Sequence, residues 1–290
     1  IPVPTSGRCE PSVSDTTQAL TPLHRPLVNK ETFQRSKRVF TFGTNKLVHE
    51  ATLVTDERQP AVSEAFHARA DVLPTGNEQV ALPPPDLAHL QDDLLETFLQ
   101  RRSSFGSFSA HIPLSRNELA TLLYFGSSVS QYVTDLKQAN GEPHFTRLMV
   151  FVNHTDGVEP GAYAYDREQH CLLPLHKGDL TLFLQQNYFL QNYNLAETGA
   201  LIAIVGNVDG MLNVYGNRGY RILNAEVGMV AQGLYMAATA LSVACGAALG
   251  FDNTTLNTML GLDRTGHKTL LFLMAGHERQ NIGNFDYRLF

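Results

Sequence analysis

The sequence predicts an α+β fold in which a mixed sheet packs around one long, buried helix. Short apolar runs of strand length, such as RLMVFV and ALIAIV, occur without the regular strand–helix alternation of a doubly wound protein. Val227–Phe251 contains no Asp, Glu, Lys or Arg, and a helix that is apolar all round is either buried in protein or spans a membrane. Ala and Gly dominate this stretch where a spanning helix would carry Leu, Ile and Phe, so we expect a core helix.

Residues 1–71 are predicted to form an N-terminal arm or small subdomain, and residues 72–290 the main domain. The first part is polar and holds one alternating piece, Lys37–Thr55, which predicts a β-hairpin with its turn at GTNK. A connector rich in Pro and Gly, Leu73–Asp86, follows, and its prolines disfavour helix.

Two helices are expected after the connector. Asp86–Arg102 has apolar residues at helical spacing, with Asp86 as a plausible cap. The next helix begins at a capping box, in which Ser115 and Glu118 are placed to satisfy each other's free backbone donors.

Further strands and two more helices complete the expected domain. The strands at 147–152 and 200–205 flank a pair of short strands joined by a turn at DREQ, and KTLLFLMAG predicts the last strand. The long helix is expected from about Leu223 to Gly250. The Gly and Asp of GFDN would then end it and cap a new helix at TTLNTMLGL.

Composition argues against several classes of protein. A formal net charge of −6 gives no basic footprint for a nucleic acid or an anionic membrane surface. The three cysteines are far apart and without ligand spacing, so neither a disulfide framework nor a metal site is expected, and a cytoplasmic location fits best. Sequence motifs for dinucleotides, nucleoside triphosphates, zinc proteases and serine hydrolases are absent.

Two segments carry arginines that are suited to binding an anion. In QRRSSFGSF, Arg101 and Arg102 end a helix, where they either hold a phosphate together with the serines or offset the helix dipole. In YGNRGYR, Arg218 and Arg221 stand at the start of the long helix, where positive charge is unfavourable unless an anion lies nearby. The second segment therefore indicates a bound anion.

The order and spacing of several segments resemble the SagB-type dehydrogenases, from about Ala65 to the C-terminus. These proteins are a branch of the flavin-dependent nitroreductase fold that includes the microcin-type thiazole oxidases and the oxidase domains of nonribosomal peptide synthetases. The segments are AFHARADVLP, QVALPPPDL, LLETFLQRRSSFGSF, PLSRNELATLLYF, GVEPGAYAYDREQHCLLPLHKGD, VYGNRGYRILNAEVGMVAQGLYMAATAL and FDNTTLNTMLGLD.

The resemblance implies a nitroreductase-like fold and an FMN-binding homodimer, with the flavin and the long helix at the subunit interface. It also implies a reaction, in which a thiazoline or oxazoline ring in a peptide is oxidised to a thiazole or oxazole. A hydride equivalent passes from the ring carbon to FMN while a protein base removes the neighbouring proton. The expected partners are a second copy of the chain and a peptide substrate, free or bound to a carrier protein.

The resemblance also assigns site residues. Tyr215 matches a tyrosine implicated in proton transfer, and Glu226 and Gly228 match the start of the long helix. The cofactor-binding positions come from the RRS segment, the loop before the first long strand, the RGYR segment and the long helix: Arg101, Arg102, Ser103, Gly141, Arg218, Arg221 and Gln232.

Some positions depart from the family pattern. Phe105 replaces the final Arg of RRSxR, Val214 replaces the Lys that thiazole oxidases carry before the Tyr, and Met229 replaces a His. The loop 138–145 keeps only the Gly of the usual flavin loop. Two alternatives therefore stay open: a divergent flavin oxidase of the same fold acting on another assembly-line substrate, and a non-catalytic partner subunit that has lost FMN.

Overall fold

The computed structural model describes residues 43–53, 74, 78–88, 94–101, 107–128, 145–190, 192–263 and 265–279. The chain divides into two units, residues 1–39 and 40–290, and all of the described residues belong to the second unit. The predicted domain boundary at residue 71 lies outside the described residues and stays a prediction.

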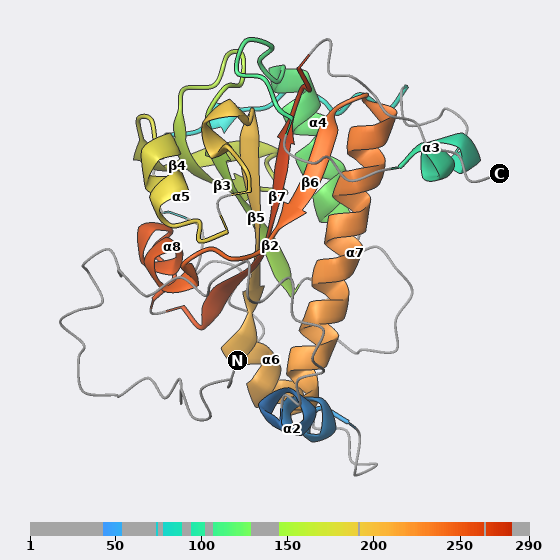
Figure 1. Ribbon diagram of the computed structural model, residues 1–290, viewed down its shortest axis with the longest axis vertical. Coiled ribbons are helices and arrows are strands. Elements are labelled where there is room, and N and C mark those ends of the chain that lie inside the picture. Colours follow the sequence, from blue (N-terminus) through green and yellow to red (C-terminus); the bar gives the residue numbers. More distant parts are fainter. Residues whose placement is uncertain are drawn as a thin grey trace, which may run out of the picture. The chain divides into compact units, whose positions relative to one another are not determined.

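One seven-stranded sheet forms the centre of the described unit, in the order β1-β4-β3-β2-β5-β7-β6 (Figure 1). Every neighbouring pair is antiparallel, so the prediction of a mixed sheet is wrong. The strands β5 and β6 run in the same direction, but β7 lies between them. The predicted strands and the DREQ turn are confirmed. The strands are β1 Val80–Ala81, β2 Thr146–Val152, β3 Gly161–Asp166, β4 Cys171–Lys177, β5 Ala200–Asn207, β6 Ala244–Ala248 and β7 His267–Gly276.

Helices cover both faces of this sheet (Figure 1). Helices α4 (Arg116–Ser128) and α7 (Arg218–Ala240) pack on one face, and α5 (Thr181–Gln186), the 3₁₀ turn η5 (Leu195–Glu197) and α8 (Asn253–Met259) pack on the other. Successive residues of a strand point to opposite faces, so the strands supply both cores. This is why their sequences read as continuous apolar runs rather than as an alternation.

The long helix is shorter than predicted. Helix α7 ends at Ala240, and Ser242 adopts a left-handed φ of 57° that turns the chain into β6. Small residues fit a closely packed helix and a closely packed strand equally well, so the Ala- and Gly-rich composition concealed the boundary. No helix in the described part of the chain is long and apolar enough to cross a membrane.

The predicted hairpin is wrong over residues 43–51. They form helix α2 (Gly43–Ala51), with Lys46 and Glu50 paired at 3.6 Å across one turn. None of its side chains is buried, so the apolar alternation that suggested a strand is not matched by a buried face.

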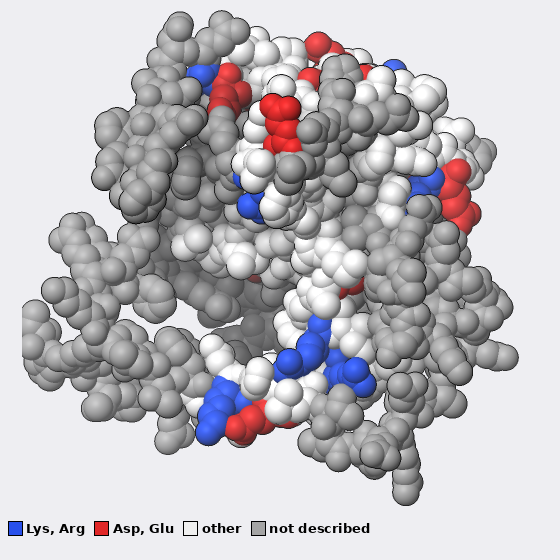
Figure 2. Space-filling model, turned by 90° about the vertical axis from the view of Figure 1, so that its right-hand side faces the viewer, with Lys and Arg blue, Asp and Glu red and all other residues white. Residues whose placement is uncertain are grey.

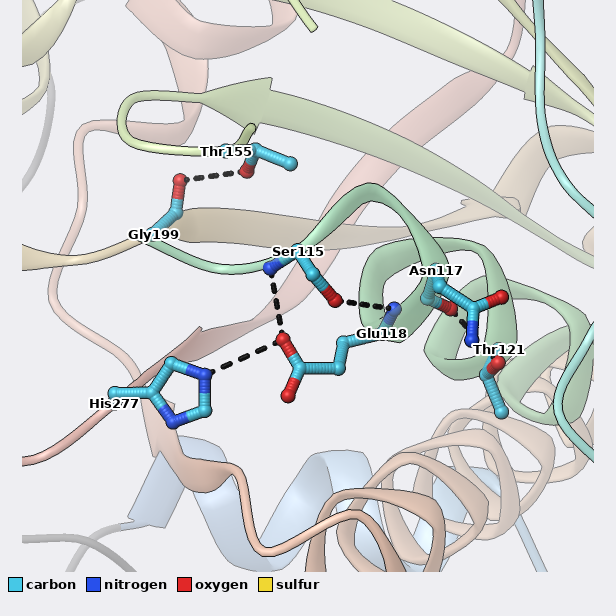
Figure 3. Close-up of polar contacts among 7 residues, drawn as sticks. All are labelled: Ser115, Asn117, Glu118, Thr121, Thr155, Gly199 and His277. Carbon is cyan, nitrogen blue, oxygen red and sulfur yellow. Dashed lines mark hydrogen bonds and ion pairs between the residues drawn. The ribbon is translucent and has the colours of Figure 1, made fainter. Parts of the chain in front are cut away.

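Local capping signals were reliable. Ser115 N donates to Glu118 Oε2 at 2.8 Å, and Glu118 N donates to Ser115 Oγ at 3.1 Å, which confirms the capping box of α4 (Figure 3). His277 Nε2, just after β7, lies 3.3 Å from the same Glu118 oxygen. Asp252 caps α8 as predicted, accepting from the amides of Thr254 and Thr255.

The helix predicted over 86–102 is described only as α3 (Leu94–Gln100). Asp86 Oδ1 accepts a hydrogen bond from Ala88 N at 3.1 Å, and residues 89–93 lie outside the described residues.

Candidate functional site

The predicted site residues that the structure describes are spread along α7, most of them near its two ends. Arg101 contacts Tyr235 near the end of the helix, whereas Arg218 is its first residue. Seventeen residues at 1.5 Å per residue separate Arg218 from Tyr235, which corresponds to about 25 Å. Gln232 lies between them and is half-buried. Arg102, Ser103 and Gly141 lie outside the described residues.

Arg101 follows α3 and stacks on an aromatic ring. Its guanidinium carbon is 4.2 Å from the centroid of Tyr235, a ring that is itself buried. The Nε of Arg101 is buried and has no hydrogen-bond partner among the residues that the structure describes. The arrangement fixes a cation and leaves one N–H donor available, as binding of an anion requires.

A pocket of about 270 Å³ lies at this end of α7 and is lined by Gln100, Thr239, Ser242, Val243, Ala244, Cys245 and Glu278. Burial raises the pKa of the Cys245 thiol to about 12, although the nearby Arg101 charge acts in the opposite direction. Cys245 therefore stays a neutral thiol and is not a nucleophile. The carboxylate of Glu278 would repel an anion placed against it in this pocket.

The chain that follows the RRS segment is tied to the end of β7. Ser109 N donates to His277 O at 2.9 Å, and Arg279 N donates to Ser107 O at 2.9 Å. Glu197 joins this contact, because its carboxylate accepts from Ala110 N at 3.0 Å and lies 3.2 Å from Arg279. The bond from Ala110 N is the main cause of a pKa below the usual range for Glu197.

At the other end of α7, the two glycines of YGNRGYR allow the sharp turn between α6 and α7 and the close packing of the two helices. Helix α6 (Val208–Tyr215) ends at Gly216, whose φ of 57° and ψ of −150° reverse the chain. A Cβ on Gly219 would lie 2.1 Å from the carbonyl oxygen of Met211, so only Gly allows α6 and α7 to approach this closely. Arg218 is exposed beside this corner. Lys and Arg side chains gather toward the lower end of the face in Figure 2, the end at which α7 begins.

Arg221 has a protein partner here. Its guanidinium donates to Thr52 Oγ1 at 3.0 Å and to the carbonyl of His49 at 3.1 Å, in the last turn of α2. Cations stabilise the C-terminal end of a helix, so α2 compensates for an arginine in the first turn of α7. The anion that the sequence indicated is not required by Arg221.

Tyr215, the predicted acid/base, ends α6 and is half-buried. Its ring meets the ring of Phe145 edge to face, with centroids 6.4 Å apart and an interplanar angle of 80°. Val214, which precedes it, is 1% exposed, so the side chain at the position of the family's Lys faces the core. Glu226 is also buried and bonds to the backbone at Phe145, a contact that sequence reasoning did not find.

Comparisons with known proteins agree with this architecture. Residues 136–277 match the family described as the nitroreductase family. The chain is also similar to a protein of Methanocaldococcus jannaschii that is assigned as a nitroreductase, with 29% identity over 161 residues, 55% of this chain and 78% of the relative.

Solved structures show the nitroreductase-like fold. A chain from Anabaena variabilis, assigned as a nitroreductase, matches with a TM-score of 0.64 at 20% identity over 85% of this chain; the match spans 49% of the Anabaena chain. A Ralstonia eutropha protein, also assigned as a nitroreductase, matches with a TM-score of 0.55 at 17% identity over 76% of this chain and 94% of that one. A chain of the E. coli microcin synthetase complex McbBCD, with truncated pro-MccB17 bound, matches with a TM-score of 0.52 at 15% identity over 86% of each chain.

Proposed function

We propose that this protein is an FMN-dependent oxidase that converts thiazoline or oxazoline rings of a peptide to thiazoles or oxazoles. The single observation that carries the cofactor assignment is Arg101, a cation held 4.2 Å from the Tyr235 ring with a buried N–H donor that no described residue uses. Nitroreductase family proteins typically bind flavin, and the FMN phosphate is a dianion of the kind that Arg binds well.

The residues present fit the phosphate end of FMN. Arg101 would donate to it, and Arg102 and Ser103 are the predicted further partners. The backbone bonds between 107–109 and 277–279 hold the described chain that follows the RRS segment against the end of β7. When bound, FMN would supply the acceptor for the hydride equivalent that leaves the substrate ring.

The reaction is inferred from the branch that the sequence resembles. Tyr215 would hold or accept the proton at the ring carbon, because a phenol in hydrogen-bond reach of substrate can act as a general base or acid. The fold likeness to a chain of a microcin synthetase complex with a bound pro-peptide is in keeping with a peptide substrate. The proposed substrate is therefore a peptide, either free or bound to a carrier protein.

Two chains are needed to assemble this site. Arg101 and Tyr215 lie at opposite ends of α7, about 25 Å apart along its axis, which is too far for one bound FMN and its substrate to bridge. An antiparallel pair of α7 helices in a homodimer would bring Arg101 of one chain to Tyr215 of the other. The outward face of α7 suits such a contact, since Gly228 and Ala225 are exposed and Met229 and Gln232 are half-buried.

The test begins with the purified protein. We expect FMN to be released on denaturation at about one per chain, and a synthetic thiazoline peptide to lose two mass units when oxygen is supplied. Tyr215→Phe should abolish oxidation while FMN stays bound. A colourless protein with no affinity for added FMN would overturn the cofactor assignment.

A second candidate is a non-catalytic partner subunit of an active oxidase. It is favoured by Val214, whose buried side chain leaves Tyr215 without the lysine that related thiazole oxidases carry beside it. FMN binding without any azoline oxidation by wild type would instead favour a divergent oxidase with another substrate. Absence of both FMN binding and oxidation would favour the partner subunit.

A further inference from the structure

Glu226 is a carboxylate on the face of α7 that packs on the sheet. It is 1% exposed, and its neighbours Leu223, Val227 and Val230 on the helix are buried in apolar clusters. A buried carboxylate costs on the order of several kcal/mol unless hydrogen-bond donors replace its water. The donors that Glu226 uses therefore show what it does in the structure.

Three donors converge on a single oxygen of Glu226. Its Oε1 accepts from Phe145 N at 2.9 Å, from Thr146 N at 2.9 Å and from Thr146 Oγ1 at 2.7 Å. Phe145 closes the predicted flavin loop, 138–145, and Thr146 begins β2. Three hydrogen bonds to one acceptor hold the backbone of both residues, so Glu226 fixes the point at which the chain enters β2.

The sheet alone would hold the start of β2 from only one side. Strand β3 pairs with β2 only from Met149 onward, whereas β5 pairs with β2 from Thr146. Asn207 N also donates to Phe145 O at 3.1 Å from the β5 side. Glu226 therefore supplies a hydrogen-bond acceptor at the start of β2, where β3 does not pair with it.

Phe145, whose backbone Glu226 holds, also contacts Tyr215, the proposed acid/base. Phe145 is buried in a small cluster with Met211 and Leu223, and the ring of Tyr215 packs against that cluster, edge to face with Phe145. Because the backbone of Phe145 is held by Glu226 and Asn207, the position of its ring is fixed, and Tyr215 has a fixed surface to pack on.

We infer that Glu226 is a positioning residue, which sets the Tyr215 phenol through Phe145 and fixes the end of the 138–145 loop. The inference rests on the proposed function for its consequence in catalysis, but its structural part can be tested without substrate or FMN.

The chain offers graded variants of the contact. Glu226→Gln keeps an oxygen acceptor at the same reach, and Glu226→Asp keeps the charge but withdraws it by one methylene. Asn257→Ala is a matched control, because Asn257 Oδ1 in α8 accepts from Thr269 N and Thr269 Oγ1, both at 2.9 Å, in the same pattern and in the other core. The control lowers stability without touching Phe145 or Tyr215.

The first measurement is fluorine NMR of the apo-protein labelled with 3-fluorotyrosine, with the Tyr215 signal among the ten tyrosines assigned from Tyr215→Phe. We expect Glu226→Asp to shift or broaden that signal, Glu226→Gln to leave it close to wild type, and Asn257→Ala to leave it unchanged. A Tyr215 signal that is the same in Glu226→Asp and wild type would overturn the inference.

The second measurement is kinetic, at a temperature where each variant is folded. We expect Glu226→Asp to lower kcat by about tenfold or more with KM changed by no more than about threefold, since misplacement of a catalytic group acts on the chemical step. Glu226→Gln should recover most of the rate. A fall in kcat no larger than that of Asn257→Ala would overturn the inference. If wild type oxidises no azoline, the proposed function fails, and the NMR result still decides whether Glu226 positions Tyr215.

Discussion

The guanidinium carbon of Arg101 lies 4.2 Å from the centroid of the Tyr235 ring, and the hydroxyl of the same tyrosine accepts a hydrogen bond from Ala247 N at 2.6 Å. One side chain of α7 thus joins the arginine of the RRS segment to strand β6. The ring and the hydroxyl have separate partners, so their contributions can be separated by mutation.

Arg101→Ala is expected to weaken FMN binding by about 10- to 100-fold, because a charge-assisted bond to phosphate contributes about 1.5–3 kcal/mol. Titration of the apo-protein with FMN, followed by flavin fluorescence, measures the change. Tyr235→Phe is the control: it keeps the ring under Arg101 and removes the acceptor for Ala247 N, so it should lower the free energy of unfolding by about 1 kcal/mol with FMN affinity within about twofold of wild type. Equal affinities for Arg101→Ala and wild type would contradict the assignment.

Gly219→Ala is expected to destabilise the protein by about 3 kcal/mol or more, since the new Cβ would lie 2.1 Å from the backbone oxygen of Met211 and neither helix can yield easily. Gly43→Ala in α2 is the control, because its Cβ would meet nothing within 4 Å. Urea unfolding of the two variants gives the comparison. Similar stabilities would show that α6 and α7 are not packed as closely as described.

Glu197 should make stability depend on pH in the acid range. Its pKa in the folded protein is lowered, mainly by the bond from Ala110 N. A depressed pKa stabilises the fold at pH values above the unfolded pKa, and this stabilisation is lost as the pH falls through the folded pKa. Glu197→Gln should therefore be less stable than wild type by about 1 kcal/mol at pH 7 and equal to it once the carboxylate is protonated. Urea unfolding at pH 7 and at a series of lower pH values tests this, and a difference that does not shrink as the pH falls would contradict it.

Features that depend on residues close together in the sequence, such as helix caps and most strands of the sheet, were predicted correctly. The capping box of Ser115 and Glu118 and the cap of α8 by Asp252 depend on residues two or three positions apart, so the sequence contains the whole interaction. The strands were predicted because both faces of the sheet are covered, which makes each strand a continuous apolar run.

Contacts between distant segments could not be predicted. The partner of Arg221 is Thr52, 169 positions earlier, in a segment whose apolar alternation suggested a strand. The donors to Glu226 lie 80 and 81 positions away, and the only sequence signal was a single acid beside a long apolar stretch. The boundary at Ala240 was missed because small residues are compatible with both α7 and β6. In each case the deciding term is tertiary packing rather than local propensity.

The proposed two-chain site predicts complementation between two variants that are each defective. If Arg101 of one chain acts with Tyr215 of the other, a heterodimer of Arg101→Ala and Tyr215→Phe chains has one intact site and one doubly defective site. Random reassortment of equal amounts makes about half of the dimers mixed, so the activity should recover to about a quarter of wild type. Azoline oxidation is measured after the two proteins are unfolded together and refolded at an FMN concentration that loads the wild-type protein but leaves Arg101→Ala, with its weaker FMN binding, mostly without FMN. Each variant refolded alone should then show little activity. A site built within one chain gives no recovery at any mixing ratio, and that result would rule out the antiparallel pairing of α7.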